Sequence, residues 1–129
     1  MPAFSKFDLD LSFGQEGETL VKELLTGGKT VEVKRDKRWK DTGNIYVETE
    51  CYFNRTRSWG PSGINATEAD YWAFVLEGLT VFIPTDALRY AIDEFGSSIA
   101  CNIPPNPSKG VLLTVPHLLK SIKEYKNGN

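Results

Sequence analysis

Two segments of this chain alternate between apolar and polar residues with a period of two, and this pattern constrains the fold more than any other feature. Thr30–Arg35 and Asn44–Phe53 are rich in Val, Ile, Tyr and Thr, and the cluster Asp41–Asn44 between them is typical of a turn. Side chains two residues apart share a face of a strand, so both segments are predicted to be half-buried β-strands. The short connection predicts that they pair as an antiparallel hairpin.

The rest of the chain adds helices and denser apolar segments. Apolar residues recur at helical spacing over residues 13–25, where Gly27-Gly28 ends the pattern. Further on, the sequence predicts strands Tyr71–Leu76 and Leu79–Ile83 as a second hairpin or as successive central strands, a helix capped by Thr85-Asp86 that ends near Phe95, a strand Val111–Val115, and a helix from about His117 to Tyr125. The order α-β-β-β-β-α-β-α predicts a mixed α/β (α+β) fold.

Composition limits the class of protein. A chain of 129 residues with 40% apolar residues can bury one good core, so residues 1–129 are expected to form a single domain. We find neither a signal sequence nor a run of roughly 18 apolar residues, which predicts a cytoplasmic protein without a membrane partner. Cys51 and Cys101 lack metal-site spacing and are expected to be buried, reduced thiols. A net charge of −2 argues against a general nucleic-acid coat, yet a local basic patch remains compatible with it.

The predicted hairpin would bring like charges together. If Asp36 and Asn44 close it, Glu32 lies opposite Glu48, Lys34 opposite Tyr46 and Thr30 opposite Glu50, all on one face. Opposed carboxylates destabilise a sheet unless a cation lies between them, and Mg²⁺ (or Mn²⁺) prefers carboxylate oxygens while leaving positions open for a phosphate. The alternative is a solvated face on which Glu32 pairs with Lys34 and Glu48 points to water.

Basic residues are concentrated after the first strand. Five of the seven residues in Lys34–Lys40 are basic, and Trp39 lies among them, a composition that suits phosphate contacts beside a ring that stacks on a base or sugar. An ordinary loop with a half-buried Trp is the alternative. The candidate DNA-binding residues are Arg35, Lys37, Arg38, Trp39, Lys40, Arg55 and Arg57.

Other chemistry has little support in the sequence. Trp72, Phe74 and Phe82 are expected in the core, and Asp70 is expected to have a structural role. His117 is the only histidine and is expected to begin the last helix, which leaves no basis for a Ser/His/Asp or Cys/His nucleophile. No GxxxxGK motif is present, so no nucleotide cofactor is expected.

An ordered set of motifs resembles a known family. Gly14, Gly17 and Glu18 form GxxGE, Glu32 and Lys34 form ExK, and KRD, TGN, Glu48 and Pro61–Trp72 follow. Together they resemble the PD-(D/E)xK nuclease superfamily, in particular its small phage and bacterial Holliday-junction-resolvase-like endonucleases. The resemblance implies a restriction-endonuclease-like core, a mixed central sheet flanked by helices, with one or two Mg²⁺ ions held by acids. By this likeness Glu18 is the helix acid, and Glu32 and Lys34 are the ExK pair.

One acid of the family pattern has no counterpart here. The superfamily acid on the strand before ExK would fall in residues 23–29, which contain no Asp. Three substitutes are open: Glu32 in that role with Glu48 as the second acid, Asp36 from the loop, or Asp8 and Asp10 from before the helix. The opposed positions of Glu32 and Glu48 favour the first.

The resemblance therefore implies a Mg²⁺-dependent endonuclease that acts on branched or duplex DNA. Glu32 and Glu48 would hold metal, Glu18 would contact the metal and orient its water, and Lys34 would stabilise charge at the phosphate. A nuclease of this size that cuts both strands is expected to act as a homodimer. The alternative is a nuclease-fold protein without catalysis that serves as a DNA-binding or assembly module.

Overall fold

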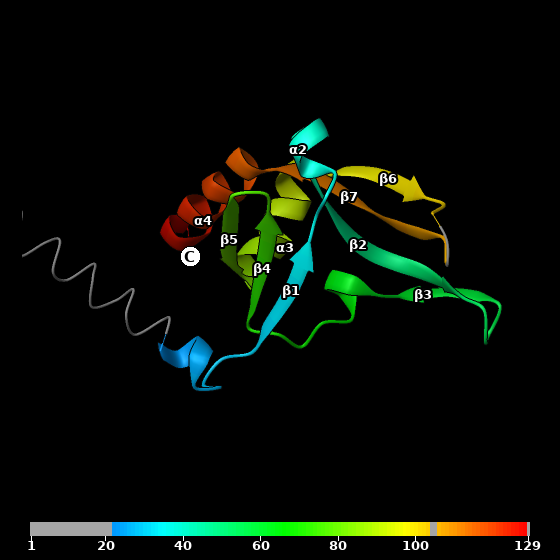
Figure 1. The fold of residues 1–129 in the computed structure, drawn as a ribbon, viewed down its shortest axis with the longest axis horizontal. Helices are drawn as coiled ribbons and strands as arrows, with labels where there is room; N and C mark the ends of the chain where they lie inside the picture. The colour runs from blue at the N-terminus through cyan, green and yellow to red at the C-terminus, as the bar shows by residue number, and fades with distance from the viewer. Residues whose placement is uncertain (1–21, 104–105, 129) are drawn as a thin grey trace, which may run out of the picture.

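The strands predicted from the alternation do form, but they belong to two different sheets. The computed structural model describes residues 22–103 and 106–128, and it shows an α+β fold in which helices flank a mixed and an antiparallel sheet (Figure 1). The elements in chain order are β1 (Val31–Arg35), α2 (Trp39–Thr42), β2 (Asn44–Phe53), β3 (Ser58–Pro61), the 3-10 helix η1 (Gly63–Asn65), β4 (Tyr71–Leu76), β5 (Leu79–Pro84), α3 (Thr85–Phe95), β6 (Ser97–Cys101), β7 (Ser108–Thr114) and α4 (Val115–Gly128).

The predicted pairing of the first two strands is wrong. β1 pairs in parallel with β4, with Glu32 beside Trp72, in a three-stranded sheet of order β1-β4-β5. β2 instead joins the antiparallel sheet of order β3-β2-β7-β6. The predicted register of Glu32 with Glu48, like those of Lys34 with Tyr46 and Thr30 with Glu50, is therefore absent.

Two local features explain the difference. β4 has buried side chains on both faces, including Trp72 and Ala73, so it is a central strand that needs a neighbour on each edge, and β1 is one of these neighbours. After β1 the chain does not make a tight turn. The N–H of Asp36 donates to Val75 O of β4 (3.3 Å), and the chain then forms the short helix α2, which redirects it into the second sheet.

The second half follows the prediction more closely. β4 and β5 form the expected antiparallel hairpin, turning at Gly78, which has a φ of 78°. α3 has the expected extent, but Thr85 does not cap it: Thr85 is its first residue, and its hydroxyl donates to Ala69 O (2.6 Å). β7 and α4 are longer than predicted, while α2, β3, η1 and β6 were not predicted.

The first predicted helix lies mostly outside the described residues. Residues 22–25 are helical, and Gly27 follows with a φ of 80°. The N–H of Gly28 donates to Glu23 O (2.8 Å), which satisfies a carbonyl of the last turn, so the predicted stop at Gly27-Gly28 is confirmed. None of the described helices is long and apolar enough to cross a membrane.

One hydrophobic core joins the two sheets to α3 and α4, which pack against each other (Figure 1). Its side chains come from β2, β4, β5, β7, η1 and both helices, and its largest fully buried members include Trp72 and Phe74, as predicted. Phe82 was predicted in the core but is 44% exposed. Its neighbours Val81 and Ile83 point inward, and strand alternation therefore turns Phe82 to the outer face.

Three smaller predictions have clear outcomes. Cys51 and Cys101 are free but only half-buried. Each is paired with Ser108 of β7, which lies between them, so the two cysteines are two strand spacings apart and too distant to form a disulfide. Asp70 has the expected structural role, since its carboxylate accepts hydrogen bonds from the Thr30 N–H (3.0 Å) and hydroxyl (3.1 Å) and joins the start of β1 to β4. His117 lies in the first turn of α4, where its N–H donates to the Thr114 hydroxyl (3.2 Å).

Candidate functional site

A cavity of about 720 Å³ lies where the end of β1 and the face of β4 meet the sheet of β2, β7 and β6. Its basic wall comes from Lys34 and the loop that follows β1. β4, β2 and β7 form its base, and β6 with the residues after it forms an apolar wall. The lining residues are Lys34–Arg38, Thr42, Asn44, Tyr46, Glu48, Trp72, Phe74, Ile99–Ile103 and Leu112.

Strand alternation aims two side chains of β2 into this cavity. Ile45 and Val47 are 0% and 1% exposed and face the core, so Tyr46 and Glu48 between and after them face the opposite side, which the cavity occupies. The ladder with β7 is interrupted directly after Glu48, where Thr49 forms a β-bulge. Bulges re-aim a strand locally, and this one ends the cavity face of β2 at Glu48.

The segment from Ser62 to Asn65 holds this bulge in place. The N–H of Ser62 and the side-chain amide of Asn65 both donate to Thr49 O, at 3.0 and 3.2 Å. Gly63 has a φ of 54°, and a Cβ at this position would overlap the carbonyl of Glu48. Only glycine fits between these backbones, which gives a structural reason for Gly63 within the Pro61–Trp72 stretch.

Lys34 and Glu32 share one face of β1. Lys34 Nζ lies 3.8 Å from Glu32 Oε2 and 5.7 Å from the centroid of the Trp72 ring. Both partners of the ion pair are partly exposed, so the pair itself stabilises the fold little. Lys34 lines the cavity, whereas Glu32, two residues earlier on the same strand face, is not one of the cavity-lining residues. The ion pair is the one that the solvated-face alternative predicts.

Asp36 is fully used by the backbone. Its Oδ1 accepts hydrogen bonds from the N–H groups of Arg38 (3.0 Å) and Trp39 (3.1 Å), and its Oδ2 accepts one from Tyr46 N–H (3.0 Å). Three donors on one carboxylate fix its orientation. Asp36 therefore organises the basic loop, and the hypothesis that it swings in as a metal ligand has no support in this arrangement.

Glu48 is in the opposite situation. Its side chain is half-buried against the cavity and has no hydrogen bond or ion pair with any residue of the described ranges 22–103 and 106–128. Its neighbour Tyr46 donates to or accepts from the Ser108 hydroxyl (2.7 Å). Burial chiefly raises the pKa of Tyr46 above its ordinary 10.0, and the charge of Glu48 adds to the rise, so Tyr46 stays neutral near pH 7.

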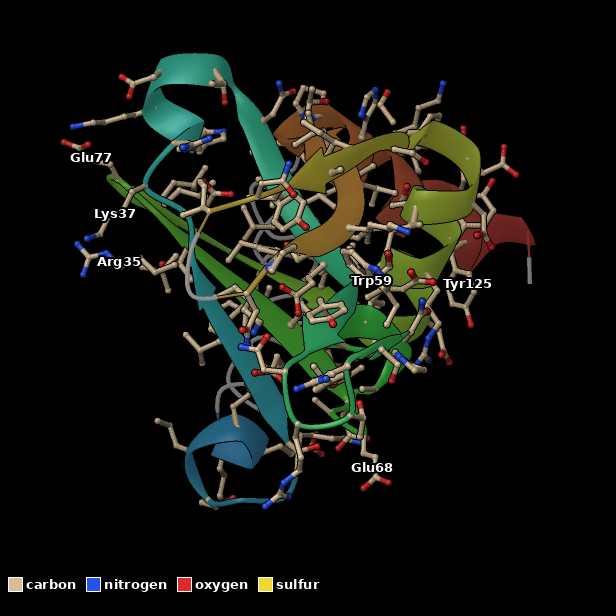
Figure 2. The ribbon with its side chains drawn as sticks, turned by 90° about the vertical axis from the view of Figure 1, so that its right-hand side faces the viewer. Arg35, Lys37, Trp59, Glu68, Glu77 and Tyr125 are labelled. Carbon is tan, nitrogen blue, oxygen red and sulfur yellow. The ribbon has the colours of Figure 1, made fainter. Side chains whose placement is uncertain are left out.

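The predicted basic residues separate into three groups. Arg35, Lys37 and Arg38 line the cavity together with Lys34, and Figure 2 shows Arg35 and Lys37 projecting to the same side of the molecule from the end of β1 and the loop after it. The second group is Lys40, whose Nζ lies 3.4 Å from Glu77 Oε2 outside the cavity wall. The third group, Arg55 and Arg57, lies in the turn between β2 and β3.

Trp39 and Glu18 complete the predicted set. Trp39 begins α2 and is partly buried against the core. This agrees with the alternative of a half-buried Trp in an ordinary loop. Glu18 lies outside the described residues. Among the residues that are described, no three His, Cys, Asp or Glu side chains form a group suited to a metal ion.

The sequence reasoning missed one wall of the cavity altogether. Ile99 and Ile103 are 41% and 50% exposed and belong to β6 and the residues after it. The only sequence signal for β6 is the short run Ser97–Cys101, which contains a single β-branched apolar residue.

Comparisons of this chain with protein-family models, with curated proteins and with solved structures found no match.

Proposed function

We propose that this chain binds DNA along the cavity between its sheets and hydrolyses phosphodiester bonds with Mg²⁺ or Mn²⁺, as a restriction-endonuclease-like enzyme of the PD-(D/E)xK type. The observation that carries the proposal is the state of Glu48: a half-buried residue whose carboxylate has no partner among the described residues, in a cavity that Lys34, Arg35 and Arg38 also line. A carboxylate in a partly desolvated site is costly unless a cation or a donor reaches it.

The donors present suit a hard cation. Mg²⁺ binds through one or two carboxylates plus water and substrate phosphate, and Glu48 in the cavity and Glu32 on β1 offer oxygens of this kind, to which the family resemblance would add Glu18. When bound, the ion would lower the pKa of its water and neutralise charge at the phosphate. In this proposal Glu32 and Glu48 hold the ion, and Glu18 is a further metal and catalytic residue.

The basic residues would act on the phosphate itself. Lys34 Nζ, which now lies 3.8 Å from Glu32, would stabilise the charge that develops on the phosphoryl oxygens. Arg35, Lys37 and Arg38 would hold the phosphates on either side, because these three basic residues lie at the rim of the same cavity. Their charges act through counterion release and carry no sequence preference.

A binding module without catalysis is the second candidate, and one observation favours it. Glu32 lies on a strand that is not paired with the strand of Glu48, and its carboxylate is already in an ion pair with Lys34. In that function the same basic wall would bind DNA, and Glu48 would accept hydrogen bonds from a ligand or a partner protein.

Cleavage assays separate the two candidates. Purified wild type is incubated with four-way-junction, duplex and single-stranded DNA in Mg²⁺ or Mn²⁺, beside Lys34→Ala, Glu48→Gln and the control Glu68→Gln, an exposed acid outside the cavity wall (Figure 2). We expect both cavity variants to lose at least ~100-fold in cleavage rate and the control to lose little.

Binding without metal gives a second readout. Lys34→Ala should leave affinity equal or weaker, while Glu48→Gln removes a negative charge beside a polyanion and should leave it equal or tighter. Wild type that binds all three DNAs and cuts none of them would replace the enzyme by the binding module. Wild type that binds none would end both candidates.

A further inference from the structure

The cavity has two chemically different sides. Along one side lie four basic residues from the end of β1 and its loop. The two acids that line the cavity are Asp36, whose oxygens accept hydrogen bonds from backbone N–H groups, and Glu48 on β2. The other side is apolar, with Ile99 and Ile103 41% and 50% exposed. Large apolar side chains that stay exposed inside a concave site mark it as a binding surface.

Two asparagines also line the cavity, Asn44 at the start of β2 and Asn102 directly after β6. Neither side chain forms a hydrogen bond with the described part of the chain. An Asn amide offers both donors and an acceptor, the combination that pairs with the edge of a nucleobase. A ligand that matches the whole site would have an anionic end, an apolar face and a polar edge.

We infer that this cavity holds an unpaired nucleotide of a DNA strand, with its phosphate at Lys34–Arg38 and the face of its base against Ile99 and Ile103. The inference rests on the proposed DNA binding and specifies the form of DNA that the site prefers. A volume of about 720 Å³ falls in the range of small-ligand sites, which suits a single nucleotide and excludes a double helix from the interior.

Base pairing decides access to the apolar wall. In a duplex both faces of a base are stacked, so duplex DNA reaches only the basic rim. An unpaired or extruded base exposes a face that an apolar side chain can cover, and its removal from the stack costs least where it has no partner. Single-stranded segments and branch points with unpaired bases are therefore the preferred substrates.

The test compares two DNAs of the same sequence, a fully paired duplex and the same duplex with one central unpaired base. Their dissociation constants are measured without metal for wild type, for Ile99→Ala/Ile103→Ala, and for the control Leu119→Ala, which truncates an exposed side chain on α4 (57% exposed). We expect wild type and the control to prefer the unpaired DNA by about tenfold. The double variant should lose this preference and keep its salt dependence, because no charge has changed.

A second measurement needs no variant. A fluorescent base analogue, 2-aminopurine, is placed at the unpaired position or at a paired position of the duplex, and its emission is followed as wild type is added. A saturable change at the unpaired position alone supports the inference. Equal affinity of wild type for the two DNAs overturns the inference, and so does a double variant that keeps the preference. In either case, binding to the duplex leaves the proposed function standing. Absence of binding to both DNAs overturns both.

Discussion

Asp36 Oδ2 accepts a hydrogen bond from the backbone N–H of Tyr46 at 3.0 Å, and this contact ties the loop after β1 to the strand that carries Glu48. β1, which carries Lys34, and β2, which carries Glu48, belong to different sheets. No backbone hydrogen bonds of a shared sheet therefore hold these two residues opposite each other across the cavity. The other oxygen of Asp36 accepts from Arg38 and Trp39 and shapes the basic loop. One carboxylate thus organises both sides of the proposed site.

Replacing Asp36 by Ala should lower the free energy of unfolding by about 2–4 kcal/mol, since three N–H groups lose a charged acceptor. Chemical denaturation measures the loss. Asp41→Ala is the matched control, because Asp41 is exposed on α2 and its side chain has no hydrogen bond or ion pair with the described residues; its effect should stay within about 0.5 kcal/mol. Equal effects of the two substitutions would contradict the role of Asp36.

Gly63→Ala should destabilise the fold by about 2–5 kcal/mol, through a positive φ and the overlap of the new Cβ with the Glu48 carbonyl. Gly78→Ala is the control: its φ is 78°, but a Cβ there meets no atom within 4 Å. It should cost only about 1 kcal/mol. Thermal or urea unfolding of both variants gives the loss of unfolding free energy for each, and the difference between the two losses measures the steric overlap at Gly63. A difference near zero would show that the Ser62–Asn65 segment does not hold the bulge in place.

Asp70 should make the fold sensitive to acid. Hydrogen bonds from the Thr30 backbone, and then from its side chain, hold the pKa of Asp70 below its ordinary 3.8. A lowered folded-state pKa means that the contribution is present above pH 3.8 and disappears as the pH falls through the folded-state value. Asp70→Asn should therefore reduce stability at pH 6 and flatten its fall below pH 4, whereas Asp93→Asn, an exposed change on α3, should leave the profile of unfolding free energy against pH intact.

Removing charge from the basic wall should weaken DNA binding regardless of sequence. With Arg35, Lys37 and Arg38 all changed to Gln, the slope of log affinity against log salt should fall by about 2–3 units, near 0.9 for each lost phosphate contact. Lys40→Gln should change it less, because Lys40 pairs with Glu77 outside the cavity. Titrations at several salt concentrations measure the slopes. An unchanged slope in the triple variant would assign the loop to ordinary solvated surface.

Divalent metal should stabilise the folded protein if Glu48 is a ligand. At a hundredfold excess of Mn²⁺ over its dissociation constant, the free energy of unfolding should rise by about 2.7 kcal/mol. Glu48→Gln should remove most of this rise, and Glu68→Gln should keep it. Melting curves with and without metal provide the measurement without any need for activity. A melting temperature that is unchanged by millimolar Mn²⁺ would count against the metal site.

Local patterns predicted much of the second half of the chain. The dense apolar runs of β4 and β5 and the helical stripe of α3 appear with nearly the expected bounds, because their period and their turn residues act over a few positions. The cavity wall of β6 could not be predicted in this way. Five residues with one β-branched apolar side chain form a strand only because β7 offers an edge to pair with.

The structure brings two of the candidate residues to one cavity, but not by the predicted pairing. Lys34 and Glu48 line one cavity, and alternation alone predicts that Tyr46 shares the face of Glu48. The predicted hairpin that was to bring Glu32 opposite Glu48 does not form, since proximity in sequence favoured the pairing of β1 with β2 and the central position of β4 competes for β1.

The sequence by itself determined that the segments of β1 and β2 form strands and which side chains of β2 share a face, because a two-residue period is a property of the extended backbone. It also determined where basic residues gather, since they are consecutive. Only the tertiary structure decided which strands are neighbours. Pairing depends on how apolar faces from distant parts of the chain are buried together, and that burial moved β1 beside β4, left Glu48 facing a cavity, and placed Ile99 and Ile103 across from the basic loop.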